Sequence, residues 1–193
     1  MKAKNGITRQ NKVHFAEQAI ISAEDREKIW QAIDAGDHDA EAAIIIIYTG
    51  MRVSELLEVE KNNFDLSARM LVVGKKTEAR RIPIHSCIVP FVTRLMQTEG
   101  DFLMMRYDGD HPAEMTLDYF QNYIWKSLTK RLDIGQYTVH AGRHTCLTMM
   151  RNAGIDDDVC NLIIGHRRAD IADRYIHYSD EILVEEMDKV TGR

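Results

Sequence analysis

Apolar residues recur at helical spacing near the start of the chain, between residues that typically begin or end helices. Ser22 is followed by an acidic turn and then by apolar positions, which predicts a helix over residues 23–35. Asp37 is the expected cap of a second helix, roughly 38–48, whose run of four isoleucines has no polar face. Isoleucine also suits buried strands, but the alanines before this run and Gly50 after it favour a helix buried in the core.

Beyond Gly50 the pattern predicts more helices and a small sheet. A short helix starts near Arg52, and Met70–Val73 and Arg81–Ile84 are the expected strands of a hairpin, with Pro83 marking an edge position. The predicted fold class is therefore mainly α with a small antiparallel β-sheet (α+β) of two or three strands. Further helices are expected over residues 87–98, 116–132, 138 or 140 to 154, 156–164 and 169–177, with a final amphipathic segment over 182–190.

The middle of the chain gives less definite signals. Residues 101–105 are a possible short strand, and 107–112 are expected to be a loop. In the helix that Thr116 caps, Tyr123 is expected to face the core. Trp125 is also expected in the core, with a nucleic-acid contact as the alternative.

Length and composition place the chain among ordinary globular proteins. It has 193 residues, of which 45% are hydrophobic and 28% charged, and can bury a core without disulfides or metals. No apolar run approaches the ~20 residues that span a bilayer, and the polar start lacks the apolar region of a signal peptide. The three cysteines show no CxxC spacing, which is typical of buried thiols in a reducing compartment, so a cytoplasmic protein is expected.

The net charge of −5 argues at first against a nucleic-acid partner. The charges are unevenly distributed, however, because residues 15–66 are mostly acidic whereas residues 67–86 and 121–151 are mostly basic. If the fold brings the two basic segments together, one face of an acidic molecule becomes positive. The alternative is an ordinary solvated surface with patchy charge.

Groups suited to phosphate chemistry are concentrated in the segment 138–178. His140 and His144 are spaced like a zinc pair, but the glutamate of the HExxH motif is missing and no third ligand is placed, so no metal is predicted. Earlier in the chain, Arg52 stands in the first turn of a predicted helix, where the helix dipole favours anions and an arginine suggests an oxyanion ligand. The alternative is a surface arginine paired with Glu55.

Five short motifs, taken in order, resemble those of the tyrosine recombinase (phage integrase) family. Each is weak alone, but their order and the nine residues from His166 to Tyr175 make the resemblance specific. Gly142 departs from the family pattern, in which leucine is more usual, and is expected to loosen the local packing. Glu55 is expected to orient an arginine or a histidine. The motifs are TGMRVSEL at 49–56, KTEARRIPI at 76–84, HAGRHT at 140–145, IGH at 164–166 and YIH at 175–177.

This resemblance implies that a tyrosine attacks a phosphodiester. Arg52 and Arg143 would each present a planar, two-pronged set of donors to the phosphate oxygens. His140 and His166 would donate to the same centre or exchange a proton with it. Tyr175 would be the nucleophile and would form a covalent phosphotyrosine that stores the energy of the broken bond. These donors supply the charge stabilisation that metal ions often give, so neither a metal nor a cofactor is expected.

Two assignments within this site have alternatives. A lysine of the hairpin would protonate the leaving 5′ oxygen, and the motif favours Lys76 over Lys75. The nucleophile could instead be Tyr178, but the spacing from the preceding histidine favours Tyr175.

The resemblance covers residues 15–193 as a catalytic domain, and residues 1–14 are expected to be a flexible leader or linker remnant. The family usually has an N-terminal core-binding domain of roughly a hundred residues, which is too large for this leader. The chain is therefore expected to be either a catalytic fragment, which is favoured, or an unusually minimal enzyme. The apolar stripe of residues 182–190 would either dock on a neighbouring subunit or close the chain's own core.

The expected function is therefore that of a site-specific DNA recombinase, the integrase of a phage or mobile element. Its partner would be double-stranded DNA, on which it would act as a tetramer, while the isolated chain would be a monomer. A chromosome-dimer resolvase is a closely related alternative. A type IB topoisomerase and a non-catalytic DNA-binding module are further alternatives, and the complete set of reactive residues argues against the last of these.

Overall fold

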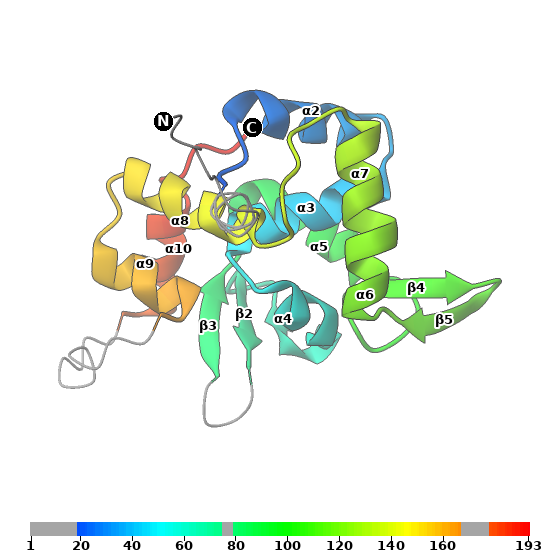
Figure 1. The fold of residues 1–193 in the computed structure, drawn as a ribbon. Coiled ribbons are helices and arrows are strands. Elements are labelled where there is room, and N and C mark those ends of the chain that lie inside the picture. The colour runs from blue at the N-terminus through cyan, green and yellow to red at the C-terminus, as the bar shows by residue number, and fades with distance from the viewer. Residues whose placement is uncertain (1–18, 75–78, 167–177) are drawn as a thin grey trace, which may run out of the picture.

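Short helices packed around one buried helix form most of the structure, a computed structural model that describes residues 19–74, 79–166 and 178–193 (Figure 1). The predicted class, mainly α with small antiparallel sheets, is confirmed. The described strands are β1 (Phe64–Asp65), β2 (Met70–Val73), β3 (Arg80–Pro83), β4 (Met105–Asp108) and β5 (His111–Glu114). The described helices are α2 (Ala23–Asp34), α3 (His38–Thr49), α4 (Val53–Glu58), α5 (Val89–Leu95), α6 (Leu117–Tyr119), α7 (Lys126–Arg131), α8 (Ala141–Asn152), α9 (Asp157–Ile164) and α10 (Asp180–Met187), with the shorter turns η1 (Lys61–Asn63), η2 (Ser86–Ile88) and η3 (Phe120–Trp125).

Helix α3 forms the centre of the core. Every residue from Ala40 to Thr49 is buried, including the four isoleucines. A helix that is apolar on all sides must be covered on all sides, and α2, α8 and η3 pack against it. Asp37 caps its start and Gly50 ends it with a left-handed φ of 65°, as the sequence predicted.

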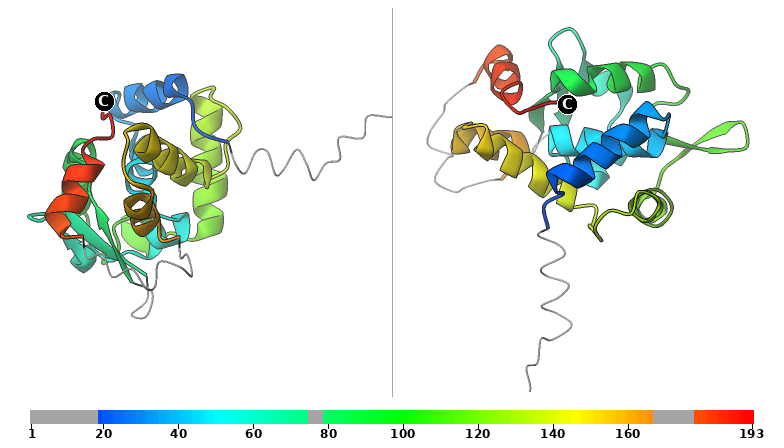
Figure 2. Two further views of the ribbon diagram at one scale, coloured as in Figure 1. Left: turned by 90° about the vertical axis from the view of Figure 1, so that its left-hand side faces the viewer. Right: turned by 90° about the horizontal axis from the view of Figure 1, so that it is seen from above.

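The sheet β1–β2–β3 is antiparallel and carries β3 at its edge, which confirms the position predicted from Pro83. Helices α9 and α10 pack against β3, and Figure 2 shows α10 beside the sheet. Strand β3 begins with Arg80, which lies opposite Val73 of β2. The start of β3 and the end of α9 are therefore neighbours, although they are far apart in the sequence.

The prediction of a loop at residues 107–112 is wrong, because β4 and β5 form a two-stranded hairpin there. Gly109 supplies the positive φ of 64° that the tight turn requires. The hairpin lacks the alternating apolar pattern of a half-buried strand, since both strands are exposed or only partly buried. The strand considered for residues 101–105 is also misplaced, because residues 101–104 hold only an isolated bridge between Glu60 and Phe102 and β4 begins at Met105.

The inward orientation predicted for Tyr123 is wrong as well, since 64% of this residue is exposed. It lies in η3, a π-helical segment whose wider turns shift the residues away from the faces that a 3.6-residue period predicts. Trp125 is buried, as expected, and its indole N–H donates a hydrogen bond to the carbonyl of Tyr137 at 2.8 Å.

Helix α10 and the residues after it close the chain's own core. Leu183, Met187 and Val190 are buried, whereas Ile182 is exposed. The C-terminus lies beside α2 (Figure 1), where Arg193 pairs with Asp34. Of the two alternatives for this apolar stripe, the structure shows the intramolecular one.

Helix α8 crosses α3 closely at Gly142, contrary to the expectation of loose packing. A Cβ placed on Gly142 would lie 2.8 Å from Cγ2 of the buried Ile46. We therefore expect Gly142→Leu to lower the free energy of unfolding by about 1–3 kcal/mol through overpacking. Urea unfolding measures this change. Asn152→Leu, on an exposed position of the same helix, should stay within about 0.5 kcal/mol, and an equal effect of both substitutions would contradict the packing argument.

The helix predicted for residues 169–177 lies outside the described residues. Among the helices that are described, none has the length and apolarity to cross a membrane.

Candidate active site

Arg143 joins two segments that are distant in the sequence. It lies in the first turn of α8, and its Nη1 donates to the carbonyl oxygen of Gly50 at 2.7 Å. Its Nη2 donates to the carbonyl oxygen of Ile164, the last residue of α9, at 2.5 Å. Because Gly50 stands two residues before Arg52 and Ile164 two residues before His166, these bonds bring the three predicted residues into one site.

Arg52 is the N-cap residue of α4, and 48% of its side chain is exposed. Its backbone N–H donates to Oε2 of Glu55 at 2.7 Å, and its Nη1 donates to Oε1 of the same residue at 2.9 Å. The pairing with Glu55 that was the alternative to an oxyanion role is therefore present. The exposure leaves one side of the guanidinium open to solvent, so the ion pair and an anion ligand are compatible.

Arg80 is a component of this site that the sequence interpretation missed. The predicted strand began one residue later, at Arg81, which left Arg80 in the turn of the hairpin, but only 10% of its side chain is exposed. Its Nη1 and Nη2 donate to the two carboxylate oxygens of Glu55 at 2.5 and 2.8 Å. The sequence did contain an indication of this burial. Side chains alternate between the two faces of a strand, so Arg80 lies on the same face as the buried Ile82.

The expected role of Glu55 in orienting an arginine is consistent with these bonds, which involve two arginines. Burial by itself raises the pKa of the Glu55 carboxyl, but hydrogen bonds from Arg80 and from the backbone of Arg52, with the charges of both arginines, lower this pKa overall. Glu55 is therefore a carboxylate at neutral pH. The guanidinium groups of Arg52 and Arg80 bind this carboxylate, and the charge of Arg143 interacts with it, so three cations face one anion and leave a positive excess.

The excess of positive charge affects the ionisation of its neighbours. Burial, followed by the charges of Arg52 and Arg80, lowers the pKa of Arg143 to about 10, so this side chain remains charged at neutral pH. Burial, followed by the charges of Arg143 and Arg52, lowers the pKa of His166 below its ordinary 6.5. His166 is thus an uncharged imidazole at neutral pH, which can either donate or accept a proton.

His140 and His144 lie at the start of α8, His140 as its N-cap residue and His144 one turn further, and both are exposed. Burial, followed by the charges of His140 and Arg143, lowers the pKa of His144. In the part of the chain that the structure describes, no group of three or more histidine, cysteine or acidic side chains is arranged to hold a metal ion.

Three of the predicted residues, Lys75, Lys76 and Tyr175, lie outside the described residues. The alternative nucleophile Tyr178 is described and packs partly buried against the core. Burial, followed by the negative charges of Asp156 and Asp158, raises the pKa of its phenol. A raised pKa disfavours the phenolate that attacks a phosphate.

In the described parts of the two basic segments, the positive charge is partly compensated. Several of their arginines are paired with acidic residues from other elements, which neutralises part of the charge. These pairs are Arg69 with Asp188, Arg81 with Asp180, Arg131 with Asp37 and Arg151 with Asp157.

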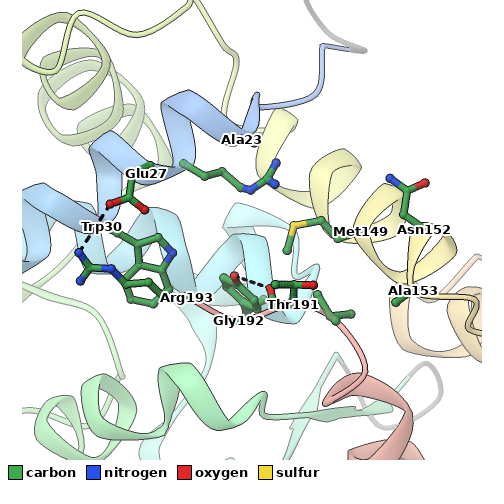
Figure 3. A pocket seen from close by; sticks show the side chains of 12 residues that line it. Ala23, Glu27, Trp30, Met149, Asn152, Ala153, Thr191, Gly192 and Arg193 are labelled. Carbon is green, nitrogen blue, oxygen red and sulfur yellow. Dashed lines mark hydrogen bonds and ion pairs between the residues drawn. The ribbon is translucent and has the colours of Figure 1, made fainter.

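A separate hollow of about 410 Å³ lies between α2, the end of α8 and the C-terminal residues (Figure 3). Trp30, Met149 and Arg193 are among the side chains that line it. Because Met149 and Asn152 stand at the end of α8 and Arg143 at its start, this hollow is distinct from the arginine site.

Comparison with known proteins gives matches to a family profile, to curated recombinases and to solved structures. The sequence profile of the phage integrase family matches residues 19–181. The chain is 28% identical over 182 residues to tyrosine recombinase XerC of Staphylococcus carnosus, a match that covers 88% of this chain and 59% of that protein. It is 26% identical over 172 residues to XerC of Staphylococcus saprophyticus, covering 81% of this chain and 57% of the relative. The chain thus spans less than two thirds of the length of these curated relatives.

Solved structures show the same fold. The integrase of transposon Tn1549, in complex with circular intermediate DNA, gives a TM-score of 0.67 at 20% identity, covering 90% of this chain and 67% of that one. The XerA recombinase gives a TM-score of 0.66 at 22% identity, covering 91% and 66%. The profile match extends from before α2 to the start of α10 and includes Arg52, Arg143 and His166. The chain belongs to the phage integrase family.

Proposed function

We propose that this chain is the catalytic domain of a site-specific DNA recombinase that cuts and rejoins DNA through a 3′-phosphotyrosyl intermediate. The observation that carries the proposal is the position of Arg143, whose bonds to the carbonyls of Gly50 and Ile164 bring Arg52 and His166 beside it. Residues from three separate segments thereby form one site with excess positive charge, which suits a phosphodiester anion.

In the proposed reaction the hydroxyl oxygen of Tyr175 attacks the scissile phosphorus. A bond forms between phosphorus and the tyrosine oxygen, the bond to the 5′ oxygen breaks, and the product is a 3′-phosphotyrosyl link with a free 5′ hydroxyl. The tyrosine proton passes to a histidine of the site, His140 or His166, and Lys76 gives a proton to the leaving 5′ oxygen. A 5′ hydroxyl from another duplex reverses these steps and joins the strands.

Arg52 and Arg143 have a separate role, which is to stabilise charge. The pentacoordinate transition state carries more negative charge on its equatorial oxygens than the ground state does. Guanidinium groups held in place before the reaction stabilise this state without reorganising, and Arg143 is held by two backbone carbonyls. The neutral His166 beside them complements the two fixed cations as a group able to exchange a proton.

The proposed partner is double-stranded DNA, on which four copies would assemble for strand exchange, whereas the isolated chain would be a monomer. Support for DNA comes from a structural relative, the Tn1549 integrase, which was solved with DNA. Support for a monomer comes from α10, whose Leu183 and Met187 are already buried in the chain itself. Residues 15–193 would be the catalytic domain and the site of action the cytoplasm, where bacterial DNA is found.

Covalent trapping tests this function. The full chain is incubated with a pool of nicked duplexes whose sequences together cover the DNA on both sides of its gene. Cleavage near the nick releases a short fragment, and its loss prevents religation. We expect a covalent protein–DNA adduct, seen on a denaturing gel, to form equally with Mg²⁺ and in EDTA. An adduct that requires a divalent metal, or no adduct with any duplex, would overturn the proposal.

The trapped duplex also identifies the class of recombinase. The relatives include both a transposon integrase and XerC proteins. For the integrase of a phage or mobile element, we expect the cleaved sequence at the boundary of the element that carries the gene. Relaxation of supercoiled plasmid without any sequence preference would instead indicate a topoisomerase.

A further inference from the structure

We propose that Arg80 is a positioning residue for cleavage, which holds Glu55 and the end of α9 so that Arg52 and His166 are correctly placed. This inference rests on the function proposed above and assigns a further residue to the same site. Arg80 stands at the start of β3. In space its side chain lies against Gly165, the residue directly before His166.

The first observation is that Arg80 binds Glu55 with the geometry of a two-pronged fork. Both guanidinium Nη atoms donate to the two oxygens of one carboxylate, and the side chains of Arg80 and Glu55 are only 10% and 12% exposed. Two parallel charge-assisted bonds fix the orientation of the carboxylate, which a single bond from a lysine would not do.

The second observation is that the same carboxylate also binds Arg52. Oε1 of Glu55 accepts from Nη1 of both Arg52 and Arg80, and Oε2 accepts from the backbone of Arg52 as well as from Nη2 of Arg80. If Arg80 were absent, Glu55 would be a buried anion with Arg52 as its remaining partner in the described part of the site. Arg52 would then be drawn fully to the carboxylate and withdrawn from a phosphate.

The third observation concerns the end of α9. Nε of Arg80 donates to the carbonyl oxygen of Ile163 at 3.0 Å, next to the Ile164 carbonyl that Arg143 holds. A Cβ on Gly165 would lie 2.7 Å from Cδ of Arg80, so the glycine allows the arginine to lie against the chain just before His166. Arg80 and Arg143 thus satisfy two consecutive carbonyls that the helix itself leaves unpaired.

These contacts place Arg80 behind the reacting groups and not among them. Its Nε, Nη1 and Nη2 are all engaged with protein atoms, and it is almost completely enclosed, whereas Arg52 is half exposed. Arg80 therefore acts through Arg52 and His166, and does not itself bind the phosphate.

The test compares Arg80→Met with Arg81→Met. Arg81 is the next residue of the strand, is more exposed and is paired with Asp180. Arg81→Met therefore also removes one positive charge, but at a position outside the site. With the duplex trapped by the unmodified chain, at saturating protein, we expect Arg80→Met to slow single-turnover cleavage about 10- to 100-fold, the effect of displacing catalytic groups by about 1 Å. The dissociation constant for DNA should change by less than about threefold, because a positioning role acts on the chemical step.

A second variant separates positioning from a merely structural role. In Arg80→Met with Glu55→Gln, no unpaired carboxylate remains to withdraw Arg52, so this double variant should cleave at least as fast as Arg80→Met alone. If the two residues acted independently, their losses would multiply. Arg80→Lys, which keeps the charge but not the fork, should recover part of the rate. Circular dichroism before each assay shows which variants are folded. If Arg80→Met is not folded, Arg80→Lys with and without Glu55→Gln takes its place in the same comparison.

The outcomes distinguish this inference from the function on which it rests. If the unmodified chain forms no adduct, the proposed function itself is refuted. If Arg81→Met forms the adduct normally and Arg80→Met cleaves equally fast, only the role of Arg80 is refuted. The same holds if the double variant is slower by the product of the two single losses.

Discussion

Tyr175→Phe is expected to abolish the covalent protein–DNA adduct while DNA binding stays unchanged. Phenylalanine keeps the ring but lacks the oxygen that must form the bond to phosphorus, so no other group of the site can replace it. The measurement is the adduct on a denaturing gel after incubation with the nicked duplex, with a gel shift under native conditions to confirm binding. No other substitution considered for this protein should have so large an effect.

Tyr178→Phe is the matched control for this experiment. Tyr178 is three residues further along the chain, packs against the core and has a phenol whose pKa is raised. We expect this variant to form the adduct at close to the unmodified rate. Adduct formation by Tyr175→Phe together with its loss in Tyr178→Phe would transfer the role of nucleophile to Tyr178.

Arg143→Ala is expected to slow cleavage by about 100- to 1,000-fold, equivalent to ~3–4 kcal/mol of lost transition-state stabilisation. The substitution removes a cation held at the centre of the site and also leaves the carbonyls of Gly50 and Ile164 without their donor. Single-turnover cleavage measures the loss, at a temperature where thermal unfolding shows the variant to be folded.

Arg52→Ala separates charge stabilisation from structural support. Arg52 is half exposed and its described partner is Glu55, which also binds Arg80, so its removal leaves the site assembled. We expect a loss of similar size to that of Arg143→Ala but with little change in melting temperature. A loss below tenfold for either arginine would be incompatible with its proposed contact to the transition state.

Helix positions were the most predictable part of the fold. Ser22, Asp37 and Gly50 act through bonds to residues a few positions away, so their effect is visible in the sequence and the predicted boundaries were close to those observed. The β4–β5 hairpin and the exposed Tyr123 were predicted wrongly. The hairpin buries too little to show a period of two, and the π-helical turns of η3 break the period from which Tyr123 was placed.

The kinds of residue needed for phosphate chemistry, and the spacing of most of them, could be inferred from the linear chain together with its family resemblance. The pairing of Arg80 with Glu55 could not be inferred, because the two residues are 25 positions apart and meet only when β3 packs beside α9 and Arg80 reaches Glu55 of α4. The charge of the Glu55 carboxylate, which two arginines share, depends on that packing, since burial and the neighbouring arginines determine the pKa of this group. Local bonds follow from neighbouring residues, whereas the electrostatics of the site follow from contacts that only the folded chain creates.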